Sequence, residues 1–570
     1  MRICGIKLTH DGAVALIEDG RLIFCIEQEK RSNNPRYQTI DNLDAIVVAL
    51  AEHGLNPGNV DQFVLDGWVG KQESQFNLFS GTAPVVLKGG PYVEQEPASV
   101  LVSREGLGLR LDGRDYPYVS FPHVTGHVAA AYCTSPFAKA GQPAFCLLWD
   151  GGTFPRLYYV DRGGARFVDF LFPMIGHIYA AAALHFGPYK QVKRSNWDLG
   201  DPGRVDPGGA GKLNLGVAGK LMAYIALGSV NEDIVRVFRD LYNKSFAANT
   251  NPGNFRTDIP SMESALAITH EFFDASAPRL KASSPEDVLA SFHCFLERLL
   301  IQQMSTALQR HSSLAARNLC IAGGCGLNIK WNSALRATGL FDSVWVPPFP
   351  NDSGSAIGAA CCAMSADKGF APLDWSVYSG PALEHCNIPP GWTSAPCSLH
   401  QLAAILASNR PVVFLSGRAE LGPRALGSRS ILAAPTSAKT KDHLNDVKLR
   451  EHFRPVAPIC LEDRAPDIFN PGTPDPYMLF DHQTRAEWRE RVPAVVHLDG
   501  SARLQTICRH SQHKVAELLV EYETLTGIPL LCNTSANHHG RGFFPSVAAA
   551  CEWGRVDHVW CDGTMWRKIT

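Results

Sequence analysis

The chain has 570 residues, more than one hydrophobic core accommodates, so we expect two or more domains. Hydrophobic residues make up 45% and charged residues 19%, and the net charge of −2 argues against nucleic acid or an acidic membrane surface as a partner. No apolar run reaches the roughly 18 residues of a membrane-spanning helix, and the N-terminus has no secretory signal pattern. We therefore expect a cytoplasmic protein.

The first part of the chain is predicted to alternate strands and helices. Residues 3–8 and 12–30 are rich in β-forming residues, and the Glu-Asp-Gly sequence at 18–20 predicts a hairpin turn within the second run. A helical pattern follows at 40–55. Further strands are predicted at 61–68, 144–152 and 156–161.

The next part is predicted to be mainly helical before the alternation returns. The helical region runs from 255 to 320, and its longest periodic segment is 286–311. Residues 318–335 then predict a strand, a tight glycine turn and a helix, and residues 343–364 repeat that plan. Alternation of this kind predicts α/β layers. Residues 186–216 are basic and loop-like, and both a role over a site and a plain surface loop are open.

A stretch rich in Pro and Gly near 366–395 marks the expected domain boundary. We place the two domains at 1–370 and 371–570. No internal sequence repeat or low-complexity tract is evident. The strand candidates of the second domain are 411–417, 430–435, 494–498, 528–535 and 556–562.

Sixteen cysteines are scattered through apolar stretches and form neither a CxxC pair nor a zinc-ribbon spacing. We interpret them as buried, reduced thiols, as expected in a cytoplasmic protein. Cys325, which stands between two glycines, is the candidate exception.

Four residues of the first domain are candidate metal ligands. His123 and His127 stand four residues apart in a predicted helix, where both imidazoles share one face; a well-packed helix also explains the pair. Asp150 ends a buried strand before two glycines, which places a carboxylate beside amides that can approach a phosphate. Asp352 precedes a helix, either as a ligand or as its N-cap. Together these nitrogen and oxygen ligands suit a divalent first-row metal that also touches nucleotide phosphates.

Basic residues gather in two stretches of the second domain, 417–435 and 447–458. They alternate with Gly, Pro and apolar residues, which is unusual for a solvated surface. Such a cluster fits a polyanion such as ATP, through bidentate and charge-assisted hydrogen bonds. Its members are Arg418, Arg424, Arg429, Lys448, Arg450 and Arg454.

The motifs of the first domain follow a recognisable order: a hairpin, the His-x-x-x-His helix, a strand followed by Asp-Gly-Gly, then AGK, AGGxGLN and NDSG. This order resembles the ATPase fold of actin, sugar kinases and the heat-shock chaperones. Within that group it looks most like the branch that transfers carbamoyl groups, which includes the tRNA threonylcarbamoyl transferases. The resemblance of residues 218–228 to an AGK-containing segment implies that Lys220 contacts a phosphate, with a solvated lysine as the alternative.

Three strings of the second domain are more specific: GPRALGxRS at 422–430, K-x-R-E-x-x-RP-x-AP at 448–458 and NTS-x-N at 533–537. They closely resemble the O-carbamoyltransferases of antibiotic and nodulation-factor biosynthesis, and the resemblance covers nearly the whole chain. The second domain is similar to the YrdC-like, threonylcarbamoyl-AMP-synthase-like α/β domain. Residues 10–30 look most like the subgroup that carbamoylates the hydroxymethyl group of cephem antibiotics.

The resemblance implies a role for each matching residue. The implied metal ligands, for iron or a similar divalent ion, are His123, His127, Asp150 and Asp352. The implied nucleotide loop holds Gly323, Gly324 and Asn328. The residues implied around a carbamoyl adenylate are Arg418, Arg424, Lys448, Arg450, Arg454, Arg503, Asn533 and Ser535. His10 matches a histidine near the transfer site.

The chain departs from the family where NTSFN and a following Gly-Glu-Pro are usual. Ala536 replaces the aromatic residue, and Arg541 stands where Glu is usual. The edge of the adenylate site is therefore expected to differ. Roles for Asn537, His538 and His539 stay open.

The implied activity is ATP-dependent O-carbamoylation of a small natural product. In the second domain, carbamoyl phosphate would release carbamate, which ATP converts to carbamoyl adenylate. Lys448, Arg424 and Mg²⁺ would stabilise the phosphates. In the first domain, an acceptor hydroxyl would take the carbamoyl group with His10 as general base, unless His10 only closes a turn with Asp11.

Two other functions stay open on the sequence alone: carbamoyl transfer to a tRNA or protein, and a nucleotide-sensing ATPase without transfer. The first favours a basic face, which the net charge does not support, and the second leaves the basic cluster without a role. Mn, Co and Zn also suit the metal ligands. Trp68, Tyr189 and Trp197 are open as acceptor-pocket, core or surface residues, and a homodimer is a candidate assembly.

Overall fold

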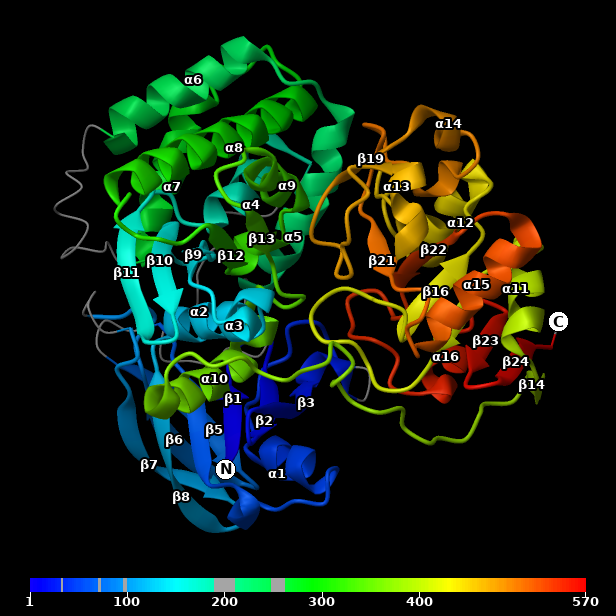
Figure 1. Ribbon diagram of the computed structural model, residues 1–570, viewed down its shortest axis with the longest axis horizontal. Coiled ribbons are helices and arrows are strands. Elements are labelled where there is room, and N and C mark those ends of the chain that lie inside the picture. The colour runs from blue at the N-terminus through cyan, green and yellow to red at the C-terminus, as the bar shows by residue number, and fades with distance from the viewer. Residues whose placement is uncertain (32–33, 70–72, 96–99, 189–210, 248–261, 570) are drawn as a thin grey trace. The chain divides into compact units, whose positions relative to one another are not determined.

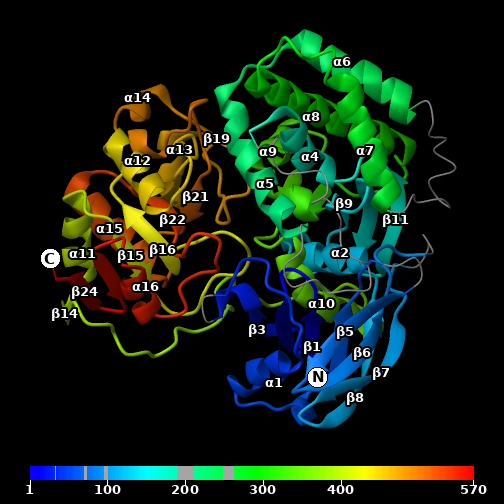
Figure 2. The same cartoon turned by 180° about the vertical axis from the view of Figure 1, so that it is seen from behind.

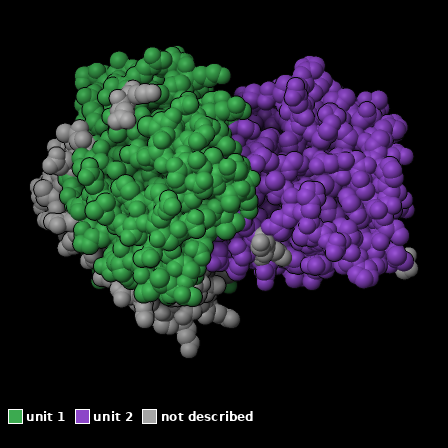
Figure 3. Space-filling model, turned by 90° about the horizontal axis from the view of Figure 1, so that it is seen from below, with its two compact units in different colours: residues 1–23, 39–375 green, residues 24–38, 376–570 purple. Residues whose placement is uncertain are grey.

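The computed structural model describes residues 1–31, 34–69, 73–95, 100–188, 211–247 and 262–569 (Figure 1). The chain forms two compact units, shown in Figure 3: unit 1 holds residues 1–23 and 39–375, and unit 2 holds 24–38 and 376–570. The boundary after residue 375 lies five residues beyond the expected one. Residues 24–38, which we had assigned to the first domain, belong to unit 2, so the chain passes between the units three times.

The first sheet of unit 1 has the strand order β3-β2-β1-β4-β8-β7. β1 pairs antiparallel with β2 and parallel with β4, which is parallel to β8. The central strands are continuous apolar runs because both of their faces are covered. The strands are β1 (Arg2–Lys7), β2 (Ala13–Glu18), β3 (Arg21–Glu27), β4 (Gln62–Asp66), β7 (Arg104–Leu111) and β8 (Arg114–Phe121).

The second sheet of unit 1 repeats this plan, with the order β11-β10-β9-β12-β13. β9 pairs antiparallel with β10 and parallel with β12, just as β1 pairs with β2 and β4. Unit 1 therefore contains a structural repeat that the sequence does not reveal. The strands are β9 (Ala144–Leu148), β10 (Arg156–Asp161), β11 (Gly164–Phe170), β12 (Asn318–Ala322) and β13 (Ser343–Trp345).

Two helices lie between the sheets, as Figure 2 shows from behind. Helix α10 (Ser355–Lys368) packs on β1, β2 and β4, while α2 (His123–Cys133) packs on β9, β12 and α10. Every residue of α2 is buried, including His123, Thr125 and His127, and most of the others are small or apolar. Gly126 of α2 and Gly358 of α10 meet so closely that a Cβ on Gly358 would lie 2.1 Å from the Gly126 carbonyl oxygen.

The remaining described elements of unit 1 surround these layers. The two-stranded sheet pairs β5 (Ser74–Ser80) with β6 (Ala83–Gly89). The predicted long helix is α8, which begins with Pro285 at its first position and the Ser284 side chain as its cap. Besides α2 and α10, the helices of unit 1 are α1 (Asp44–Ala51), α3 (Pro136–Ala140), α4 (His177–Phe186), α5 (Gly211–Tyr224), α6 (Glu232–Tyr242), α7 (Met262–Ser276), α8 (Pro285–Arg310) and α9 (Ile329–Ala337).

Unit 2 is built on an eight-stranded sheet with the order β14-β24-β23-β15-β16-β22-β17-β21. Helix α11 packs on α15, which packs on β17 and β22, over one buried apolar core. The larger elements are β14 (Trp392–Pro396), α11 (Leu399–Ala407), β15 (Val412–Leu415), β16 (Arg429–Ala433), α12 (Ala438–Val447), β17 (Ala457–Leu461), β21 (Gln505–Ile507), α15 (Lys514–Thr526), β22 (Leu530–Ser535), α16 (Val547–Trp553), β23 (His558–Cys561) and β24 (Thr564–Lys568).

Smaller elements complete unit 2. A three-stranded sheet has the order β18-β19-β20. Its strands and the two short helices beside them are α13 (Ala465–Ile468), β18 (Phe469–Asn470), β19 (His482–Thr484), α14 (Ala486–Arg489) and β20 (Ser501–Ala502).

The α/β class is confirmed in both units. One strand prediction is wrong: residues 494–498 contain part of a short 3₁₀ turn, Pro493–Val495, because proline opens the segment and removes a backbone donor. Of the predicted loop at 186–216, residues 189–210 lie outside the described part, and residues 211–216 are helical. No described helix has the length and apolarity that a membrane span requires.

The contact between α2 and α10 generates a prediction. In Gly358→Ala the new methyl group overlaps the Gly126 carbonyl, so the helices must separate, and we expect a loss of about 1–3 kcal/mol in the free energy of unfolding. Denaturant unfolding measures it. Gly219→Ala is the matched control, because a Cβ there meets nothing within 4 Å and alanine favours a helix. Equal stability of the two variants would contradict this packing argument.

Candidate functional site

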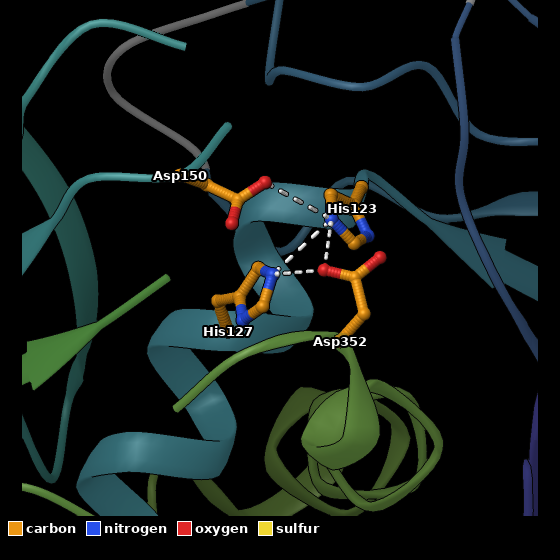
Figure 4. A group of neighbouring side chains, drawn as sticks. All are labelled: His123, His127, Asp150 and Asp352. Atoms are coloured by element: carbon orange, nitrogen blue, oxygen red, sulfur yellow. Dashed lines mark hydrogen bonds and ion pairs between the residues drawn. The ribbon is translucent and has the colours of Figure 1, made fainter. Parts of the chain in front are cut away.

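The four predicted metal ligands come together in unit 1 (Figure 4). His123 and His127 come from the first turns of α2, Asp150 follows β9, and Asp352 opens the 3₁₀ turn Asp352–Gly354 before α10. All four are buried, and one ligand atom from each lies within 4.8 Å of the others. The contact of α2 with α10 and β9 thus places side chains that are far apart in sequence around one point.

The imidazoles of this group point their Nε2 atoms at each other. His127 Nε2 lies 3.1 Å from His123 Nε2 and 3.3 Å from Asp352 Oδ1. His123 Nδ1 lies 2.8 Å from an Asp66 carboxylate oxygen. This carboxylate favours the proton on Nδ1, so the Nε2 lone pair of His123 is free to bind a metal ion. A carboxylate in this position is the usual outer partner of a metal-bound histidine. The donor set therefore fits a divalent ion.

Asp150 and Asp352 are held in place by different means. The Asp150 carboxylate accepts hydrogen bonds from the backbone N–H of Gly324, at 2.7 Å, and from the Tyr92 hydroxyl. Asp352 makes no capping hydrogen bond, and Asn351 precedes it at the N-cap position. The alternative that Asp352 is a helix N-cap is therefore wrong.

Lys7 and Asp66 also belong to this group, although the sequence analysis did not single them out. Lys7 Nζ lies 2.9 Å from Asp66 Oδ2 and 2.8 Å from Asp352 Oδ2, and 4.0 Å from the centre of the Trp68 ring. A signal for Asp66 was present, because Asp66-Gly67 stands at the end of a strand, and Asp150-Gly151 stands just after one. Lys7 only ends an apolar strand, which is no functional signal.

The charged residues of the group shift one another's pKa values. Burial disfavours a charged Asp352, but Lys7 and His123 outweigh it and hold the pKa of Asp352 well below its ordinary value. Burial and Lys7 lower the pKa of His123, yet the Asp66 and Asp352 carboxylates raise it to about 9. Both directions mean that these carboxylates require positive charge beside them.

His10 lies at the edge of the same group. Its Nδ1 is 2.9 Å from an Asp11 carboxylate oxygen, and its Nε2 is 3.5 Å from Asp352 Oδ2. The Trp68 ring packs edge-on against the imidazole. The turn contact with Asp11 is therefore present, and it also directs Nε2 toward the ligand group.

The predicted nucleotide residues of unit 1 have local roles in the fold. Gly323 has φ +84°, and a Cβ there would lie 2.4 Å from the Trp149 carbonyl oxygen. The Asn328 side chain caps α9. Lys220 is half-buried on α5. Burial raises the pKa of Cys325 well above that of a free thiol, so this cysteine has no activated thiolate.

In unit 2, predicted basic residues form a half-buried to buried group. Burial first, and neighbouring arginines second, lower the pKa of Arg424 to about 10 and that of Arg450 to about 9. The pKa of Arg503 is well below its ordinary value, first through burial and then through Arg424, Arg450 and Arg454. A bound anion would relieve the repulsion between cations placed in this way.

Lys448 lies at the buried side of this group, where it is 3% exposed. Its ammonium donates to the Ser535 carbonyl at 2.7 Å and to the carbonyl and side-chain oxygens of Asn537, both at 2.6 Å. Arg450 donates to the hydroxyls of Thr534 and Ser535. Asn537, whose role was open, therefore orients the lysine. Burial, then Arg450, holds the pKa of Lys448 well below its ordinary value.

Arg36 joins this group from the segment 24–38, and the sequence analysis missed it. Arg36 lowers the pKa values of Arg424, Lys448 and Arg450. Its backbone N–H donates to the Gly540 carbonyl, in the stretch that departs from the family motif. An arginine in a polar loop, several hundred residues away in sequence, offers no signal for this placement.

The same segment holds the loop that carries Arg424. Buried Lys30 donates to Glu27, at 2.7 Å, and to the carbonyls of Glu420 and Gly422. Glu27 in turn accepts from the Gly422 N–H at 2.9 Å. This ion pair therefore fixes the backbone directly before Arg424.

Two other predicted residues make structural contacts in unit 2. Arg429 is buried and donates to the carbonyls of Ser416 and Gly417, which makes it a structural residue. Asn533 donates to the Ala425 carbonyl and thereby supports the loop that carries Arg424. Arg418 is half-buried after β15, and its role stays a prediction.

Comparison with known proteins places both units in one family. A family model described as Carbamoyltransferase N-terminus matches residues 2–361, and one described as Carbamoyltransferase C-terminus matches residues 403–568. The chain is 69% identical over 570 residues to nodulation protein U of Bradyrhizobium diazoefficiens, which covers 100% of this chain and 97% of that protein. It is 32% identical over 588 residues to the 3'-hydroxymethylcephem-O-carbamoyltransferase of Streptomyces clavuligerus, covering 100% and 99% of the two chains. These identities do not favour the cephem subgroup over the nodulation proteins.

Solved structures add little. HypF of T. kodakarensis matches with a TM-score of 0.31, over 65% of this chain and 48% of that chain. A ROK family glucokinase of Streptomyces griseus matches with a TM-score of 0.26, over 65% of this chain and 100% of that chain. Both are 14% identical, and such scores do not assign a fold. The two family models and the full-length relatives, by contrast, show that the chain belongs to the carbamoyltransferase family and is a carbamoyltransferase.

Proposed function

We propose that the chain is an ATP-dependent O-carbamoyltransferase in which unit 2 forms carbamoyl adenylate and unit 1 transfers the carbamoyl group to a hydroxyl. The observation that carries the proposal is the group of mutually repelling cations in unit 2. Carbamoyl phosphate and ATP are both polyanions, and their binding would relieve this repulsion. The expected ATPase-like and YrdC-like folds of the two units are part of the same proposal.

In unit 2, the arginines would hold the phosphates of ATP and carbamoyl phosphate. Lys448 is fixed by Asn537 and Ser535, so its ammonium does not need to reorganise as charge develops on the phosphates. Carbamoyl phosphate and water would first give carbamate and phosphate. ATP would then react with carbamate to give carbamoyl adenylate, and pyrophosphate would leave. Mg²⁺ is the expected companion of the triphosphate.

In unit 1, His10 would take the proton of the acceptor hydroxyl. Asp11 holds Nδ1, which leaves Nε2 as the basic atom on the side of the ligand group. His123, His127, Asp150 and Asp352 would hold the divalent ion, with iron as the expected metal. When bound, that ion supplies Lewis-acid polarisation and a contact for phosphate oxygens.

The acceptor we propose is a small hydroxylated molecule of the nodulation-factor type. Nodulation protein U of Bradyrhizobium diazoefficiens is 69% identical to this chain, and that of Azorhizobium caulinodans is 52% identical over 567 residues, covering 99% and 98% of the two chains. The relative named for a cephem acceptor is 32% identical. The higher identities favour the nodulation branch for the acceptor.

Adenylate formation in unit 2 predicts an exchange of pyrophosphate into ATP that requires carbamoyl phosphate. We expect Lys448→Ala to reduce this exchange by about 10²–10³-fold, because it removes a fixed cation from the developing charge. Lys439→Ala, an exposed lysine on α12, is the matched control and keeps the wild-type rate. If the wild type shows no exchange that depends on carbamoyl phosphate, the scheme is contradicted and the sensing ATPase is favoured.

The same assay separates the two units. His123→Ala removes a unit 1 ligand, so we expect the exchange to survive while carbamoyl transfer is lost. Transfer is measured as labelled carbamoyl passed from carbamoyl phosphate to a panel of small hydroxylated acceptors. Loss of both activities in a folded His123→Ala protein would contradict the division of labour.

Metal binding by the four-ligand group is testable without turnover. We expect His127→Ala to weaken Co²⁺ binding by at least about 10–100-fold, because it removes one of four ligands. Mutation of a residue that only supports a ligand already lowers metal affinity by that factor. Titration calorimetry and the visible spectrum of bound Co²⁺ measure it. His400→Ala, an exposed histidine of unit 2, serves as control, and equal affinity of the two variants would refute the site.

The role of His10 predicts a selective loss. His10→Ala should lower carbamoyl transfer by about 10²–10⁴-fold, because a general base is removed, and should leave pyrophosphate exchange unchanged. The two rates are measured on the same preparation, so exchange reports that unit 2 is intact. Transfer within a few-fold of wild type would mean that His10 only closes its turn.

A further inference from the structure

A buried lysine stands directly behind the ligand group of unit 1. Lys7 is 1% exposed, and its ammonium contacts one oxygen of each of two carboxylates. Asp352 presents Oδ1 to the two histidines, at 3.5 and 3.3 Å, and Oδ2 to Lys7 at 2.8 Å. Asp66 shares its Oδ2 between Lys7, at 2.9 Å, and His123 Nδ1, at 2.8 Å.

A lysine in this position is a fixed charge. Burial of an ammonium is costly unless it is paired, and Lys7 is paired twice. The Trp68 ring adds a cation–π contact at 4.0 Å. Lys7 thus contributes one positive charge without occupying the point where the four ligands meet.

The formal charges around the ligand group can be counted. Among the described residues, three carboxylates contact His123: Asp66 at 2.8 Å, Asp352 at 3.5 Å and Asp150 at 3.9 Å, while the Asp11 carboxylate contacts His10 instead. With neutral imidazoles, these three carboxylates and Lys7 carry two net negative charges, which a divalent ion neutralises. Without Lys7 three negative charges remain, which match a trivalent ion.

We propose that Lys7 sets the valence of the metal centre, so that the ligand group favours a divalent over a trivalent ion. The role rests on the proposed metal site, and Lys7 acts in it as a positioning residue. Its charge draws electron density from Asp352 directly and from His123 through Asp66. Both ligands therefore become weaker donors, which disfavours the higher oxidation state.

The midpoint potential of bound iron tests this role, because it reports the ratio of the affinities for Fe³⁺ and Fe²⁺. The full-length protein is loaded with Fe²⁺ under anaerobic conditions and titrated spectroscopically. We expect Lys7→Met to shift the ratio toward Fe³⁺ by about tenfold or more, a fall of about 59 mV for each factor of ten. A potential equal to that of wild type would overturn the role.

Two further variants separate charge from packing. Lys7→Arg keeps the positive charge and should keep a potential near that of wild type. In Lys7→Met/Asp66→Asn one positive and one negative charge are both lost, so the potential should return toward wild type although both side chains have changed. A double variant that stays as low as Lys7→Met would show a packing effect and overturn the charge argument.

The remaining outcomes are equally decisive. If Lys7→Met does not fold, Asp66→Asn alone carries the test, because removal of one negative charge must raise the potential; an unchanged or lower potential overturns the role. If wild type binds no iron, no Mn²⁺ and no Co²⁺ by calorimetry, the metal site itself fails and the role of Lys7 fails with it. If iron binds but its midpoint potential is the same in all of these variants, the role of Lys7 is refuted while the metal site stands.

Discussion

Compensation of buried charge is the constraint on which the site of unit 1 depends. Lys7, Asp66, Asp352 and His123 lie together in the interior, and each of them would be costly there without the others. The glycines at the contact of α2 and α10 make this possible, because they bring the helix with the two histidines close to the turn that carries Asp352. The charge group therefore depends on the close packing of α2 against α10.

The two units bury charges of opposite sign. Unit 1 gathers carboxylates that require a cation, and unit 2 gathers arginines and Lys448 that require an anion. A metal ion would complete the first set, and nucleotide and carbamoyl phosphates would complete the second. This contrast is the physical basis on which we propose an activating step in unit 2 and a transfer step in unit 1.

Residues 24–38 belong to unit 2, although the chain on both sides of them belongs to unit 1. Strand β3 begins in unit 1 and ends in unit 2, and the segment then supplies Lys30 and Arg36 to the second unit before the chain returns. Lys30 fixes the loop before Arg424, while Arg36 adds its charge to the cations. The N-terminal hairpin is thus part of the structure of both units, which a division into two consecutive domains does not express.

Much of this protein was determined by local sequence alone. The α/β class, most strands, the long helix α8, the four clustered ligands of unit 1 and the basic motifs of unit 2 could all be predicted, because they depend on periodicity, turn residues and short motifs. The tertiary structure alone decided the rest. Lys7, Arg36 and Asn537 enter their sites through contacts between segments distant in sequence, and no local pattern encodes such contacts. The repeated sheet order of unit 1 is likewise set by long-range pairing of strands, which many different apolar sequences satisfy.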